Sequence, residues 1–149
     1  MESVPVSDRV YAWRNAMTVP AFDHVAIPIE NVQQLLVFYQ KLGFMVNDAT
    51  PPFYSIHFGD HKINLHGPEA WQSGAFTLRG STAKPGCGNF CFVWNGTLPS
   101  LIVHLRSLEI STVEGPVERK GGREFGGITG TSVYIRDPDN NLLEFMVYS

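Results

Sequence analysis

One helix pattern occurs twice in the sequence, and this repeat limits the folds that the chain can adopt. Apolar residues at i, i+3, i+4, i+7 and i+10 predict a helix with one buried face. The first set is Val32, Leu35, Leu36, Tyr39 and Leu42. The same spacing recurs 66 residues later in Leu98, Leu101, Ile102, Leu105 and Leu108. The repeat therefore predicts two copies of one structural unit.

Short apolar runs predict the strands of each copy. One run precedes each helix, at 22–29 and at 89–94. Three runs follow each helix, at 43–47, 53–58 and 62–66 in the first copy and at 112–117, 131–136 and 141–148 in the second. Turn residues precede the last run of each copy, Gly59-Asp60 and Asp137-Pro138-Asp139-Asn140. The sequence therefore predicts an α+β chain of two βαβββ modules.

Composition excludes several classes of protein. The 149 residues are 44% hydrophobic, enough for a sizeable core, and the net charge of −3 is spread along the chain without a basic stripe. No nucleic-acid partner is expected. No apolar run approaches the roughly 20 residues of a membrane span, and the first 20 residues lack the order of a signal peptide. We expect a cytoplasmic protein without a membrane partner.

Polar residues in the predicted strands suggest a site. A shift of 65 residues pairs His24 with Asn89, and a shift of 78 pairs His66 with Glu144. A lone histidine in a strand is usually a structural residue, but a buried glutamate costs several kcal/mol without a partner. Strand alternation puts Glu144 on the face opposite Leu143 and Phe145. Two histidines and a cation would supply the partner that the carboxylate needs.

Four motifs resemble the vicinal oxygen chelate superfamily, which includes glyoxalase I, extradiol dioxygenases and bleomycin-binding proteins. They are FDHVAIPIENVQQLLVFYQKLGF, FGDHKINLH, EGPVER and SVYIRDPDNNLLEF. The second and third are similar to the glyoxalase-domain branch related to dioxygenases. The resemblance implies that the two modules pair into a cup-shaped, partly open barrel. It also implies an N-terminal extension at 1–20 and a glyoxalase-like domain at 21–148, with module 1 at about 21–67, a linker at about 68–86 and module 2 at about 87–148.

The resemblance also implies a metal site. His24, His66 and Glu144 match ligand positions, and Asn89 stands where related sequences carry His or Asp. We expect one divalent metal ion, with Fe, Ni, Zn and Mn all open, bound within one chain or between two. Two histidines and a carboxylate suit non-haem iron oxygenases, but also a Lewis acid. We expect dioxygenase-like oxidation slightly more than lyase or isomerase chemistry. We also expect the enzyme to be a homodimer that acts on a small-molecule substrate.

Two further residues are candidates for proton transfer. His57 lies on the face opposite Tyr54, Ile56 and Phe58, and Tyr134 is expected at its equivalent place in the second copy. Either could line the barrel and carry a proton, and a solvated strand face is the alternative. A second alternative concerns the whole protein. Related antibiotic-sequestering proteins use the same cup without a catalytic metal, and Asn89 would then mark a degraded site.

Two loops complete the expectations. Trp71 and Phe76, in the glycine-rich linker, are expected to pack over an opening of the barrel or against a neighbouring chain. The loop at 119–127 carries Arg119, Lys120 and Arg123 among four glycines. It could close over an anionic substrate as a lid, with a solvated hairpin as the alternative.

Overall fold

The computed structural model describes residues 17–149, so most of the predicted N-terminal extension lies outside the described residues. The first module contains β1 (His24–Pro28), α2 (Val32–Leu42), β2 (Met45–Thr50), β3 (Phe53–Phe58) and β4 (His61–His66). The second contains β5 (Asn89–Val93), α4 (Leu98–Ser107), β6 (Glu114–Lys120), β7 (Thr129–Arg136) and β8 (Leu142–Val147). Two short helical turns were not predicted, α3 (Pro68–Trp71) and η1 (Arg123–Gly126). The two βαβββ modules are confirmed.

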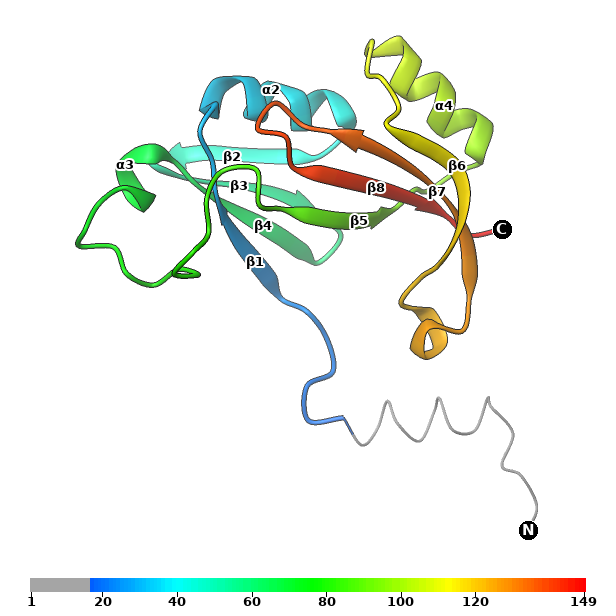
Figure 1. The fold of residues 1–149 in the computed structure, drawn as a ribbon, viewed down its shortest axis with the longest axis horizontal. Helices are drawn as coiled ribbons and strands as arrows, with labels where there is room; N and C mark the ends of the chain where they lie inside the picture. The colour runs from blue at the N-terminus through cyan, green and yellow to red at the C-terminus, as the bar shows by residue number, and fades with distance from the viewer. Residues whose placement is uncertain (1–16) are drawn as a thin grey trace.

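Each module forms a four-stranded mixed sheet with the same strand order. The orders are β1-β4-β3-β2 and β5-β8-β7-β6. The first and last strands of each module run parallel, and the other neighbours run antiparallel. Figure 1 shows both long helices, α2 and α4, on the same side of the two sheets. In the described part of the chain the two sheets share no hydrogen-bonded ladder, so they form an open arrangement.

Both helices bury their apolar stripe against the sheets. Leu35 and Tyr39 of α2 and Leu101 and Leu105 of α4 are at most 1% exposed. They belong to one hydrophobic cluster that also contains the inward strand residues of both modules. Burying one such side chain contributes roughly 1.5–3 kcal/mol. The shared cluster therefore fixes the two modules to each other on the helix side.

The turn before β8 also binds the first module. The Asp139 carboxylate accepts hydrogen bonds from the backbone nitrogens of Glu30 and Asn31, at 2.7 and 2.9 Å, and from Asn31 Nδ2 at 2.7 Å. Asn31 precedes α2 but makes no side-chain cap of its own. A carboxylate of the second module therefore caps a helix of the first, which favours one fixed angle between them.

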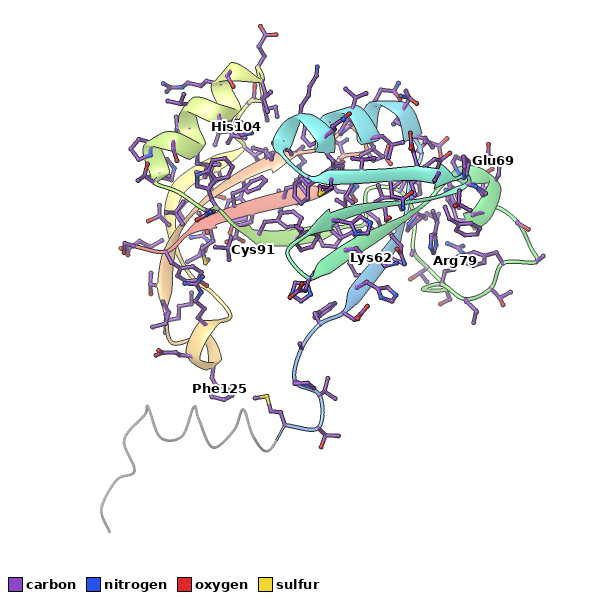
Figure 2. The ribbon with its side chains drawn as sticks, turned by 180° about the vertical axis from the view of Figure 1, so that it is seen from behind. Lys62, Glu69, Arg79, Cys91, His104 and Phe125 are labelled. Carbon is purple, nitrogen blue, oxygen red and sulfur yellow. The ribbon has the colours of Figure 1, made fainter. Side chains whose placement is uncertain are left out.

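The opposite face of each sheet is less covered. His24, Ala26, Asn89, Cys91 and Val93 are all exposed there, and Figure 2 shows Lys62 and Cys91 on the side away from the helices. Cys87 and Cys91 are free thiols. No helix among the described residues is both long and apolar enough to span a membrane. The polar faces are the places where small molecules can reach side chains of both modules.

Candidate functional site

The polar face of the first sheet is fixed by the pairing of β1 with β4. Residues that lie opposite each other in a parallel pair point to the same face. His24 lies opposite Lys62, Ala26 lies opposite Asn64, and Pro28 lies opposite His66. His66 is therefore four residues further along the strand pair than His24. At about 3.3 Å per residue this is roughly 13 Å.

The pairing of β5 with β8 gives the matching positions in the second sheet. β5 begins at Asn89 as β1 begins at His24. Asn89 lies opposite Leu142, and Cys91 lies opposite Glu144. The residue equivalent to Glu144 is therefore Asn64, which lies opposite Ala26. The expected equivalence of His66 with Glu144 is wrong by two residues, and Asn64 was missed by the sequence argument.

His66 lies among aromatic side chains at the end of the first sheet. Its ring centroid is 5.3 Å from that of Phe53 and 5.1 Å from that of Phe76, both in edge-on contact. Burial lowers the pKa of His66, because a charged imidazole loses water there. The linker residue Phe76 thus packs on this end of the first sheet. Trp71 is anchored by a hydrogen bond from its Nε1 to the Ile29 carbonyl at 2.9 Å.

Glu144 has partners within the chain. Ser132 of β7 donates a 2.5 Å hydrogen bond to its Oε2. The Cys91 thiol also contacts the carboxylate, and partial desolvation of the sulfur together with Glu144 raises the pKa of Cys91 to about 12. Cys91 is therefore a protonated thiol at neutral pH and a poor nucleophile. The carboxylate is half-buried with a hydroxyl and a thiol as neutral partners, which leaves its negative charge available to a cation.

Tyr134 lies directly opposite Glu144 on β7. Its hydroxyl oxygen accepts a 3.2 Å hydrogen bond from Arg119 Nε, and the Arg119 guanidinium lies 5.7 Å from the Tyr134 ring. Burial and the Glu144 carboxylate raise the pKa of Tyr134, while Arg119 acts in the opposite direction. The tyrosine hydroxyl is thus held between a guanidinium and a carboxylate on the polar face.

His57 lies on the polar face of the first sheet, opposite Lys62. Its Nε2 is 2.8 Å from Ser55 Oγ. Ser55 lies opposite Asn64, which makes Ser55 the equivalent of Tyr134. The expected equivalence of His57 with Tyr134 is therefore also wrong by two residues. His57 and Tyr134, the two candidate proton carriers, therefore occupy different positions along the strand direction of their sheets.

His24 has a carboxylate beside its ring. Its Nδ1 is 2.6 Å from Asp23 Oδ1, and its side chain is 46% exposed. The hydrogen bond to His24 lowers the pKa of Asp23. His24, Lys62, Asn89 and Cys91 line one cavity of about 290 Å³. Cys91 and Glu144 line a second cavity of about 260 Å³, together with Lys120 and Tyr148.

The loop expected to act as a lid forms one wall of this second cavity. The Arg123 guanidinium lies 3.9 Å from the ring centroid of Tyr148. A side chain at Gly121 would collide with the Tyr148 hydroxyl and with Met146 Sδ. The loop is therefore packed on β8 and the residue that follows it, and it brings Lys120 to the cavity that contains Glu144.

Comparisons with known proteins identify the family. A scan against models of protein families gave no match. The glyoxalase domain-containing protein RDO1 of Mycosarcoma maydis is 35% identical over 133 residues, which cover 89% of this chain and 70% of that protein. Virulence protein STM3117 of Salmonella typhimurium is 34% identical over 89% of this chain and 87% of that protein. The chain belongs to the glyoxalase-domain proteins of the vicinal oxygen chelate superfamily.

Solved structures support the vicinal oxygen chelate fold. The crystal structure of STM3117 matches with a TM-score of 0.77 and 32% identity, over 89% of this chain and all of that one. Lactoylglutathione lyase from Agrobacterium tumefaciens matches with a TM-score of 0.66 and 20% identity, over 88% and 96%. TnmS3, an antibiotic-binding protein from Streptomyces, matches with a TM-score of 0.64 and 15% identity, over 89% of this chain and 99% of that one. The last two matches show the fold alone.

The expected ligands of this vicinal oxygen chelate protein are only partly brought together. His24 and Asn89 line the same cavity, and Glu144 lines the neighbouring one. His66 lies far along the strand from His24. Within residues 17–149, no group of three His, Cys, Asp or Glu side chains comes close enough to hold a metal ion. The donors have suitable chemistry, but one chain does not assemble them.

Proposed function

We propose that this protein binds one divalent metal ion and a small metal-chelating molecule between the polar face of module 1 in one copy and that of module 2 in a second copy. His24 and Asn64 would come from one copy, and Asn89 and Glu144 from the other. The observation that carries this proposal is the strand register, because it puts these four residues at equivalent places in the two sheets. A homodimer follows from this arrangement, because each site takes module 1 from one copy and module 2 from the other.

This donor set has one imidazole, one carboxylate and two neutral amide oxygens. Oxygen donors favour harder cations such as Mn²⁺, and amide oxygens bind more weakly than carboxylates or imidazoles. The preference for dioxygenase-like oxidation rested on a second histidine ligand. With His66 roughly 13 Å from His24 along the strand pair, that preference loses its support. We therefore favour isomerase or lyase chemistry, in which a proton is moved.

Two residues are proposed to move the proton. A bound divalent metal ion would supply a Lewis acid for a substrate carbonyl. Tyr134, a protonated phenol at neutral pH, would donate a proton from the module 2 side. His57, hydrogen-bonded to Ser55 at 2.8 Å, would accept one from the module 1 side. The apolar side chains of Val93 and Met146 beside Glu144 would exclude water from the bound molecule.

A second candidate function is sequestration of a small molecule without catalysis. The two amides at metal-ligand positions favour it, because they bind metals weakly. The same fold also serves an antibiotic-binding protein. Under this proposal the polar faces hold a ligand directly, and metal ions do not change its affinity.

Titration calorimetry of metal-free protein with Mn(II), Ni(II), Zn(II) and anaerobic Fe(II) separates the two candidates. The enzyme proposal predicts near-stoichiometric binding of at least one metal, lost in Glu144→Ala. The matched control is Glu118→Ala, which removes an exposed carboxylate from β6. If no metal binds the wild-type protein, the enzyme proposal fails and sequestration is favoured.

A further inference from the structure

Asp23, the residue before His24, contacts the His24 ring. The inference drawn from this contact rests on the proposed metal site. Asp23 Oδ1 is 2.6 Å from His24 Nδ1. A carboxylate can only accept a hydrogen bond, so in this pair the Nδ1 atom must carry the hydrogen. The Nε2 atom of the neutral ring then keeps its lone pair free.

We infer that Asp23 is a positioning residue, which selects the tautomer and the orientation of His24 so that Nε2 is presented to the metal ion. Histidines that bind metals usually donate their other ring nitrogen to a carboxylate or a carbonyl, and this contact raises the basicity of the binding nitrogen. Here the contact comes from the adjacent residue. Because the contact joins two adjacent residues, it does not depend on the packing of any other strand or helix. The metal-free protein should therefore already form it.

The surroundings of His24 give the carboxylate a second effect. Lys62 lies directly opposite His24 in the strand pair, and a lysine ammonium close to a divalent cation would repel it. Asp23 lies near both His24 and Lys62, and both interact with its charge. The carboxylate therefore offsets part of this repulsion at the position where the metal would bind.

Nitrogen-15 NMR of the His24 ring tests the inference directly. In metal-free wild-type protein, at a pH where the spectrum itself shows an uncharged ring, we expect the hydrogen on Nδ1. In Asp23→Ala we expect the hydrogen on Nε2, the tautomer that an unrestrained imidazole favours in water. Asp23→Asn should keep the hydrogen on Nδ1, because the amide oxygen also accepts a hydrogen bond. The same tautomer in wild type and Asp23→Ala would overturn the inference.

Metal affinity supplies the second readout. Loss of a carboxylate that orients a ligand typically weakens binding by 10–100-fold, and we expect about tenfold in Asp23→Ala because this contact is exposed. Asp60→Ala is the control, since it removes an exposed carboxylate from the turn before β4, and we expect less than a twofold change. Equal losses of metal affinity in both variants would show that Asp23 acts only through its negative charge and would contradict the positioning role. If the wild type binds no metal, the proposed function fails, while the tautomer still tests the Asp23 contact.

Discussion

The Tyr39 hydroxyl of α2 donates a 2.6 Å hydrogen bond to Oδ2 of Asp137, in the turn before β8. The two residues belong to different modules and are 1% and 5% exposed. Asp137 also accepts hydrogen bonds from Asn141 and from the backbone of Asp139. This buried contact joins the modules at the end of the molecule where Asp139 caps α2.

Tyr39→Phe should change the stability of the protein in alkaline solution. Burial, with the nearby Asp137 charge, raises the pKa of Tyr39 well above 10.0. The folded state therefore holds the phenolic proton more tightly than the unfolded state, and this stabilisation is present below pH 10 and is lost as the pH rises above it. Urea unfolding from about pH 8 to pH 11 should show a smaller loss in Tyr39→Phe than in wild type, and roughly 1 kcal/mol lower stability at about pH 8.

The control for this prediction is Tyr54→Phe. Tyr54 of β3 is also partly buried against the core, and within residues 17–149 its hydroxyl makes no hydrogen bond to a carboxylate. Removal of the Tyr54 hydroxyl should leave the loss of stability between about pH 8 and pH 11 as it is in wild type. If Tyr39→Phe keeps the full wild-type slope above pH 10, the buried contact does not hold its proton as described.

Asp139→Ala should weaken the junction between the modules. The substitution removes the acceptor of three hydrogen bonds at the start of α2. Loss of a helix cap costs about 0.5–2 kcal/mol, and we expect the upper part of this range because the two backbone donors lose their partner. The measurement is the free energy of urea unfolding near pH 7. Asp48→Ala, at an exposed carboxylate of β2, should change it by less than about 0.5 kcal/mol.

Mixing two inactive variants should restore part of the metal binding. His24→Ala and Glu144→Ala each damage both sites of a symmetric pair. A pair that contains one chain of each variant has one intact site and one doubly damaged site. Random pairing after refolding of an equal mixture should therefore recover about a quarter of the wild-type metal content. A mixture that binds no more metal than the separate variants would place the site within one chain.

The fold could be predicted because its signals are periodic. The helix stripes and the strand alternation identify which residues face the core, and Leu35, Leu101 and Ile63 are buried as the pattern requires. The site could be predicted only in part. Alternation with a period of two puts Asn64 and His66 on the same face, but it does not say which of them lies opposite Ala26. Strand pairing decides that, and the pairing depends on contacts between distant parts of the chain.

The bond between Asp139 and Asn31 shows the same limit. The aspartates of the turn are visible in the sequence, and Asn31, a residue type that often caps helices, directly precedes α2. The actual acceptor is 108 residues away. The apolar periodicity predicted where α2 begins but not the partner of the backbone nitrogens at its start. That partner is set by how the two modules pack against each other.

The most direct test of the proposed site compares Asn64→Ala with His66→Ala. Both residues lie on the polar face of β4, two positions apart, and the register puts only Asn64 at the place equivalent to Glu144. Calorimetric titration with the metal that binds wild-type protein most tightly should show affinity reduced about tenfold or more in Asn64→Ala, and within about twofold of wild type in His66→Ala. The reverse result, with affinity lost in His66→Ala and kept in Asn64→Ala, would contradict the account.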